Sequence, residues 1–424
     1  MTTSSPHERL DAWIDAHFDD EVRFLQALVR VPTDTPPGNN ASHAERTAQL
    51  LAEFGFTAEP HPVPAAQVHA YGLQSLINLM VRRSYGDRGR VIGLNAHGDV
   101  VPPGEGWTRD PYGAEVVDGQ LYGRAAAVSK SDFATYAFAT RAIETLRPQL
   151  RGGVELYFTY DEEFGGTLGP GWLLEHGLAK CDLLLAAGFS YQVVTAHSGC
   201  LQMEVTVHGR MGHAAVPDTA IDALQGAVAI LNALYARNVA YKQVTSGVPG
   251  IVHPYINVGR IEGGTNTNVV PGTVTLKLDR RMIPEEDPAT VEQEIRDTIA
   301  QATVTRAGIR VDLKRLLLAH PLKPLAGNAP LVDAIRRHAT ELFGEDIPVC
   351  GTPLYTDARL FSERGIPAVI YGAGPRTVLE SNAKRADEHL DLEDLRRATK
   401  VVARSLFDLL AGDRQPSDAS QETT

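Results

Sequence analysis

The sequence has few cysteines and no long apolar run, and both shortages restrict the kind of protein it encodes. The three cysteines, Cys181, Cys200 and Cys350, are widely spaced and odd in number. This excludes a disulfide framework and a CxxC metal site, so we interpret them as buried thiols. No apolar stretch reaches the roughly 18 residues that cross a bilayer, and the first residues are polar. We therefore expect a cytoplasmic protein without a membrane partner.

Basic residues are also scarce relative to acidic ones. The chain has 40 Lys and Arg against 52 Asp and Glu, which gives a net charge of -12 at pH 7. A surface of this sign repels phosphate backbones, so we expect no nucleic-acid partner. The chain does have 43% hydrophobic residues over 424 positions, a globular composition and a length that suits two domains.

Helical and strand-like stretches alternate over the first part of the chain. The strands are expected at 91–94, 154–160 and 183–187, and the helices at 11–31, 132–146 and 170–176. Such alternation predicts an α/β catalytic domain with a largely parallel central sheet. Its first segment would span residues 1–199.

The pattern changes over residues 200–317, where period-two strands become common. We expect strands at 201–208, 255–261, 273–279 and 310–316 and helices at 221–235 and 288–307. This order predicts an inserted α+β domain, with a small antiparallel sheet and two helices on one face. Residues 318–412 would complete the first domain, and 413–424 form a polar tail.

Two polar clusters follow predicted strands of the first domain. His97 and Asp99 come after one strand, and three successive carboxylates, Asp161, Glu162 and Glu163, come after another. Taken alone, the first is compatible with a loop histidine beside a capping carboxylate, and the second with an exposed acidic turn. Because open α/β sheets place their sites at the carboxyl ends of strands, the two clusters together favour a functional site.

A set of motifs then gives the chain a family likeness. In order along the chain they are HGDVVPPGEGW, DPY, LYGR followed by Lys130, DEEFGG, GHAAVP, GGTNTNVVPG and LDRR. The chain resembles the two-zinc metallopeptidase and amidohydrolase family of aminoacylase, carboxypeptidase G, acetylornithine deacetylase and succinyl-diaminopimelate desuccinylase. The resemblance covers about residues 10–410 and implies a catalytic α/β domain with an inserted lid, often the dimer interface.

The resemblance assigns roles to four residues of the two clusters. His97 matches a histidine metal ligand, and Asp99 matches the aspartate that orients it. Glu162 matches the general base and Glu163 the next metal ligand.

Three other ligand positions of the family are replaced in this chain. The metal-bridging aspartate corresponds to Val128, and the carboxylate after the next strand corresponds to Phe189. The C-terminal histidine corresponds to Lys384, if Glu388 is the glutamate of the closing motif. None of these side chains does what the family's ligand does, so the resemblance implies a degenerate metal site.

We therefore expect no metal cofactor. His97 and Glu163 remain as ligand candidates, and one weakly bound divalent metal such as zinc is the alternative. Asp132, Asp387 or His389 would be displaced ligands in that case, although metal geometry tolerates little movement.

The substrate side of the resemblance is less altered. His213 matches a lid histidine that stabilises the oxyanion in the partner subunit's site, which implies a homodimer through the lid. Asn268 and Arg281 match residues that bind polar groups of the substrate, and an arginine fork suits a carboxylate. Without the surrounding motifs, His213 would be read as a turn histidine and Arg281 as half of a surface salt bridge.

Three functions remain open. The leading hypothesis is an enzyme acting on a small carboxylate-bearing amino-acid derivative or amide by metal-independent acid/base chemistry, such as epimerisation, isomerisation or elimination. Glu162 would be the base, and Lys384 or Lys130 the acid or counterion. The alternatives are an aminoacylase-like amide or peptide hydrolase with a reduced or non-standard metal site, and a non-catalytic binding or scaffold protein.

Overall fold

The chain divides into two units, the second inserted into the first. The computed structural model describes residues 4–86 and 88–411, so the predicted polar tail at 413–424 lies outside the described residues. The first unit runs to Val194 and resumes over Pro324–Val349 and from Leu360. The second consists of Thr195–Lys323 and Cys350–Arg359. Each has its own hydrophobic core.

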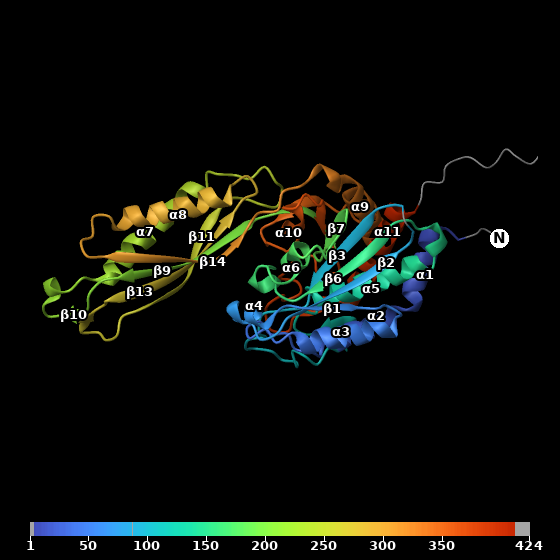
Figure 1. Ribbon diagram of the computed structural model, residues 1–424, viewed down its shortest axis with the longest axis horizontal. Coiled ribbons are helices and arrows are strands. Elements are labelled where there is room, and N and C mark those ends of the chain that lie inside the picture. Colours follow the sequence, from blue (N-terminus) through green and yellow to red (C-terminus); the bar gives the residue numbers. More distant parts are fainter. Residues whose placement is uncertain (1–3, 87, 412–424) are drawn as a thin grey trace, which may run out of the picture. The chain divides into compact units, whose positions relative to one another are not determined.

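A mixed sheet forms the centre of the first unit (Figure 1). In the described chain it has eight strands: β1 (Glu59–Pro62), β2 (Ile77–Ser84), β6 (Gly153–Thr159), β3 (Val91–His97), β7 (Leu183–Ala186), β16 (Ala368–Ile370), β8 (Val193–His197) and β15 (Val349–Thr352), in that order. The central strands β6, β3, β7 and β16 pair in parallel, and β1 and β2 continue the sheet antiparallel. β3 and β7 are buried almost throughout, as parallel strands covered on both faces must be. The predicted α/β class is confirmed.

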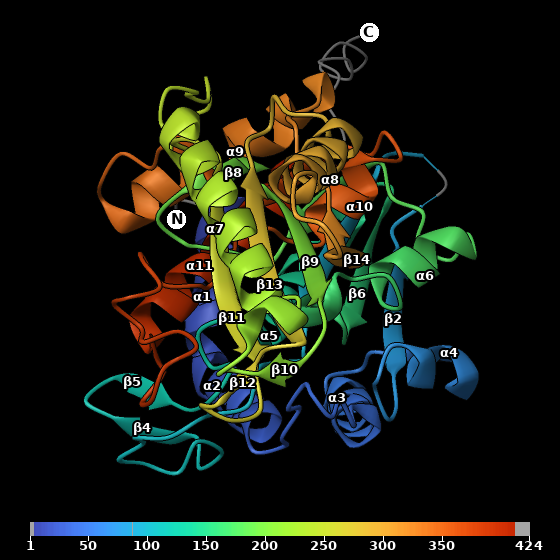
Figure 2. The ribbon, with the colours of Figure 1, turned by 90° about the vertical axis from the view of Figure 1, so that its left-hand side faces the viewer.

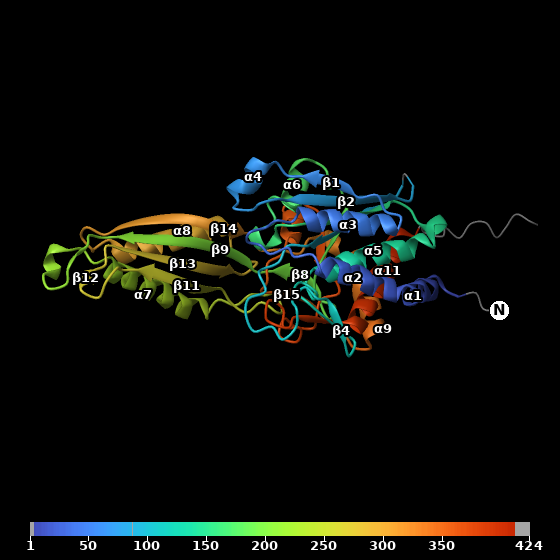
Figure 3. The same cartoon turned by 90° about the horizontal axis from the view of Figure 1, so that it is seen from below.

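Four helices pack together beside the sheet (Figure 3). They are α1 (Pro6–Ala16), α2 (Phe18–Val29), α5 (Lys130–Glu144) and α11 (Leu392–Leu410). The prediction of a single helix at 11–31 was wrong in one respect, because this region forms two helices, α1 and α2. At His17 the backbone leaves helical geometry with ψ 11°, and its Nδ1 lies 2.7 Å from the Trp13 carbonyl oxygen. This unit also contains α3 (Ala41–Glu53), α4 (Ala65–Ala70), α6 (Pro170–Glu175) and α9 (Ala329–Phe343), and α10 (Ala358–Ser362) begins in the second unit and ends in the first.

The second unit contains a four-stranded antiparallel sheet in the order β11 (Tyr255–Gly263), β13 (Thr273–Met282), β9 (Gly199–His208) and β14 (Arg310–Ala319). Helices α7 (Ala223–Tyr241) and α8 (Pro288–Thr303) pack against each other on one face of it (Figures 1 and 2). Alternate residues of β9 are buried beneath them, as the period-two pattern predicts. The pattern missed β10 (Gly212–His213) and β12 (Val269–Val270), which are too short to show a period.

A third small sheet links distant segments of the first unit. β17 (His389–Asp391) pairs with β5 (Gln120–Tyr122), which pairs with β4 (Glu115–Val117). The segments after β5 and before β17 are thereby held together, and the Gly123 amide donates to the Glu388 carbonyl at 2.8 Å. Among the helices of the described residues, none has the length and apolar character that crossing a membrane requires.

Glu21 is a fully buried carboxyl in the helical layer. It accepts one hydrogen bond, from the Thr399 hydroxyl at 2.6 Å, and its second oxygen has no partner among the described residues. Burial raises the pKa of Glu21 to about 8, since the Thr399 bond and the charge of Arg396 only partly oppose it.

Glu21 is expected to make the fold less stable as pH rises. The folded state holds this proton more tightly than the unfolded chain, so stability is full below about pH 4.5 and falls as pH approaches 8. We predict that Glu21→Gln raises the free energy of unfolding by roughly 3–5 kcal/mol at pH 9 and changes it little at pH 4.5. Thermal unfolding at both pH values checks this, with exposed Glu53→Gln as control. Equal stability of Glu21→Gln and the unmodified protein at pH 9 would contradict the prediction.

Candidate active site

The two predicted polar clusters lie at neighbouring strand ends. β3 and β6 pair in parallel, and His97 at the end of β3 is in register with Thr159 at the end of β6. The carboxylates at 161–163 therefore start beside His97, at the carboxyl edge of the sheet.

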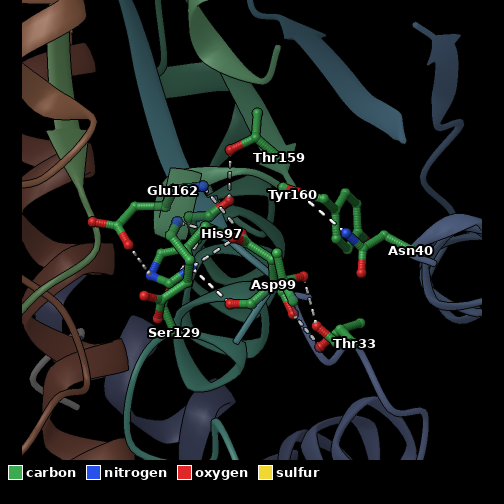
Figure 4. A network of polar contacts seen from close by, with 12 residues as sticks. Thr33, Asn40, His97, Asp99, Ser129, Thr159, Tyr160 and Glu162 are labelled. Carbon is green, nitrogen blue, oxygen red and sulfur yellow. Dashed lines mark hydrogen bonds and ion pairs between the residues drawn. The ribbon is translucent and has the colours of Figure 1, made fainter. Parts of the chain in front are cut away.

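Asp99 joins the two strand ends (Figure 4). Its carboxylate is fully buried and accepts from the backbone amides of Glu162 at 3.3 Å and Glu163 at 3.0 Å. On the other side, the Nδ1 of His97 lies 3.0 Å from the Asp99 carbonyl oxygen and 3.4 Å from its carboxylate. One aspartate thus fixes both the histidine ring and the acidic turn.

Two cations face the carboxylates of the turn. The Nε2 of His97 lies 3.9 Å from an oxygen of Glu162, and the Nζ of Lys384 donates to an oxygen of Glu163 at 2.7 Å. Burial would lower the pKa of His97, but the charges of Glu162, Asp99 and Glu163 outweigh it and raise the pKa to about 10. The same balance raises the pKa of Lys384. The carboxylates of the turn therefore favour the cationic form of both groups.

Lys130, the second candidate for the acid or counterion, is buried inside the first unit. It is the first residue of α5, is fully buried, and donates through Nζ to the Val31 carbonyl at 2.9 Å. Burial lowers the pKa of Lys130 to about 7, against the opposing charges of Asp34, Glu388 and Asp99. Its hydrogen bond ties α5 to the segment that follows α2.

A buried ion pair missed by the sequence reasoning lies behind the site. Arg124 and Glu388 are almost completely inaccessible and are joined at 2.6 Å. Glu388 also accepts from the backbone amides of Lys384 at 3.2 Å and Ala127 at 3.4 Å. It thereby fixes the segment that carries Lys384 to the segment that carries Val128. The sequence feature that could have indicated this pair is an arginine among small residues, in the segment GRAAA.

Val128 and Phe189 contribute no polar atom from their side chains. Val128 is half-buried beside Ser129, whose hydroxyl accepts from the His97 backbone amide at 3.1 Å. Phe189 is 9% exposed and forms a backbone bridge with Gly374. Hydrocarbon therefore stands at both positions that the resemblance gives to carboxylate ligands.

The substrate-binding candidates of the second unit lie on its strands and loops. His213, in β10, is exposed, and its Nδ1 accepts from the Ala215 amide at 3.0 Å. The carbonyl of Asn268 accepts from the Ala214 amide, so His213 and Asn268 belong to one small ladder. Arg281, in β13, directs its fork at Asp279, with the shorter contact at 2.7 Å.

Comparisons with known proteins identify the class. The chain belongs to peptidase family M20/M25/M40, and the match to this family covers residues 93–408. A succinyl-diaminopimelate desuccinylase from Thioalkalivibrio sulfidiphilus (strain HL-EbGR7) is 28% identical over 403 residues, 92% of this chain and 99% of that protein.

Two solved structures share the fold. An M20 family metallo-carboxypeptidase from Sulfolobus solfataricus matches with a TM-score of 0.76 and 18% identity, over 92% of this chain and 98% of that one. A Bacillus subtilis protein, described as a dinuclear metal-binding peptidase of the M20 family, matches with a TM-score of 0.66 and 17% identity, over 93% and 99%.

The comparisons correct two expectations. Metal-independent epimerisation, isomerisation or elimination was wrong as the leading hypothesis, because the family is one of peptidases and the relatives carry the name of a hydrolase. The chain is an enzyme homologue of hydrolase type. The expectation of no cofactor is also contradicted, because a member of the family is described as dinuclear metal binding.

The residues at this site nevertheless do not fit a pair of metal ions. Val128 and Phe189 offer no donor atom, and the ammonium of Lys384 stands against Glu163. His97, Glu162 and Glu163 retain donor atoms, and each zinc needs three or four ligands. These three side chains are fewer than the ligands that two zinc ions need.

Lys384 is expected to compete with metal ions for Glu163. We predict that Lys384→His, which removes the ammonium and adds a donor nitrogen, tightens zinc binding at this site by about tenfold or more. Zinc titration of chelator-treated protein measures the effect, with exposed Lys180→His as control. Unchanged affinity in Lys384→His would show that the ammonium does not limit metal binding.

The Arg124–Glu388 pair is expected to be costly to break. Glu388→Ala leaves a buried guanidinium without its carboxylate and should lower the free energy of unfolding by roughly 3–5 kcal/mol. Joint replacement of both residues by Met should cost less. Urea unfolding measures both, and Glu345→Ala is the control, because the Arg376–Glu345 pair has the same 2.6 Å separation but is about half exposed. A loss no larger than in the control would contradict the prediction.

Proposed function

We propose that this protein hydrolyses the amide bond of a small amino-acid derivative that carries a carboxylate. Membership of a peptidase family supports a hydrolase. The relatives are named for removing a succinyl group from diaminopimelate, which supports N-acylated amino acids as the substrate class. The observation that carries the proposal is Glu162, a carboxylate that follows a strand end and lies 3.9 Å from the Nε2 of His97.

Glu162 acts as the base for water. Its carboxylate takes one proton from the water molecule while the water oxygen bonds to the amide carbon. The carbon–nitrogen bond then breaks, and the same proton passes from Glu162 to the leaving nitrogen. Asp99 keeps the base in place because it binds the backbone amide of Glu162.

His97 and Lys384 stabilise the negative charge that develops on the carbonyl oxygen. Both are cations on the same acidic turn, and preorganised charge aimed at an oxyanion is usually the largest contribution to catalysis of this type. His97 is additionally fixed by the Asp99 carbonyl, so its Nε2 side remains directed to the turn.

The second unit, which is the lid of the resemblance, provides the groups that bind the substrate's carboxylate. We assign carboxylate binding to Arg281 and Asn268 and oxyanion contact to His213, acting in a homodimer through the second unit. The exposure of His213 supports this role, since a residue that serves a partner's site must be accessible. A cytoplasmic location likewise remains a prediction from the sequence.

Glu162→Gln tests the proposal. We expect kcat for hydrolysis of a panel of N-succinyl and N-acetyl amino acids to fall by about 10²–10⁴-fold with little change in KM. The reason is that the side-chain amide of the introduced glutamine cannot accept the proton from water. Release of the free amine is the measurement, and exposed Glu175→Gln on α6 is the control. Failure of the unmodified protein to hydrolyse any member of the panel, or an unchanged rate in Glu162→Gln, would refute the function.

A further inference from the structure

A second cluster of metal-ligating side chains lies in the first unit. His7 belongs to the first turn of α1, His338 to α9 and Asp408 to the last turn of α11. Helix α11 packs against both α1 and α9. The three side chains offer two imidazole nitrogens and a carboxylate oxygen, all within 4.8 Å of one another. We propose that His7, His338 and Asp408 form a binding site for a divalent transition-metal ion, with zinc as the reference ion.

The geometry of the cluster is near that of a zinc site. The Nε2 of His7 lies 2.8 Å from one oxygen of Asp408, and the Nε2 of His338 lies 2.6 Å from the other. Zinc ligands lie about 2.0–2.2 Å from the ion, so their atoms are separated by about 3.4 Å in a tetrahedron. The two contacts, which are made to different oxygens of Asp408, have to open by less than about 1 Å, and a separation of up to 4.8 Å within the cluster has to close by about 1.4 Å at most. His7 sits in the first turn of its helix and is one-third exposed, so it has room for that movement.

Burial organises the cluster around one side of the His338 ring. His338 is 2% exposed, and its Nδ1 has no hydrogen-bond partner in the described part of the chain. All polar contacts of this buried ring are therefore made through Nε2, toward Asp408 and the neighbouring Arg337. His7 and Asp408 are partly exposed, which leaves solvent access for a fourth ligand such as water.

Arg337 is the natural competitor of a metal at this site. Its guanidinium donates to the same oxygen of Asp408 as His338 does, at 2.5 Å. The Arg337 side chain is 58% exposed, so its guanidinium can leave Asp408 and be hydrated instead at a small cost in free energy. Two imidazoles and one carboxylate suit zinc, copper and nickel, whereas arginine is no ligand to any of them.

A metal here would connect three helices that are distant in sequence. It would fix α1 to the C-terminal half of α11 and to α9, and it would add the binding free energy to the stability of the first unit. This role is structural and does not depend on the proposed hydrolysis.

Zinc chloride titration of the chelator-treated full chain tests the proposal, with thermal unfolding as a second readout. The His97→Ala background removes the candidate active site from the zinc count. In that background we expect about one equivalent of zinc to bind and to raise the midpoint of unfolding. Adding His7→Ala should weaken binding by about tenfold or more and abolish the thermal shift, whereas adding exposed His69→Ala should change neither. When His97 is left unchanged, His7→Ala should likewise remove one equivalent of bound zinc.

Arg337→Ala separates a metal site from a simple hydrogen-bonded cluster. Because it removes the competing cation, zinc affinity should rise several-fold, although the variant loses an ion pair. Zinc binding that His7→Ala leaves unchanged, or weaker zinc binding in Arg337→Ala, would overturn the proposal. Either result would leave the proposed hydrolysis untouched, since that is measured by amine release.

Discussion

Charge balance at the ends of β3 and β6 is the constraint on which the candidate site depends. Parallel pairing of the two strands brings Asp99, Glu162 and Glu163 together, and carboxylates at this density are costly without positive partners. His97 and Lys384 supply those partners from within the chain. The site therefore balances part of the negative charge of its acidic turn with the nitrogen groups of His97 and Lys384.

The scaffold around the site holds these charges by hydrogen bonds between distant segments. Glu388 binds Arg124 and the backbone of Lys384, so a single buried carboxylate positions the segment that delivers the ammonium to Glu163. The small sheet of β17, β5 and β4 supports the same junction. Removing an element of this arrangement would affect the site through position rather than through chemistry.

Much of the fold could be predicted because periodicity is a local property. The parallel sheet, the inserted antiparallel sheet and the strand-end position of His97 and Glu162 all follow from short stretches of sequence. Contacts between distant residues could not, because they depend on the finished fold. The Arg124–Glu388 pair joins positions 264 residues apart, and the bond of Lys130 to Val31 depends on how α5 meets α2.

The error about the reaction has a physical origin in the site itself. The resemblance places Val128, Phe189 and Lys384 at three ligand positions of the family, and the hypothesis of metal-independent chemistry depended on that assignment. The assignment does not determine which proton Glu162 removes. A carboxylate beside fixed positive charge can deprotonate a carbon next to a carboxylate or a water next to an amide, and both reactions need the same base and the same oxyanion stabilisation. What separates them is the position of the substrate relative to Glu162. That position is determined by the pocket and not by the ligand residues, so the family relationship decides the reaction class where the altered ligands cannot.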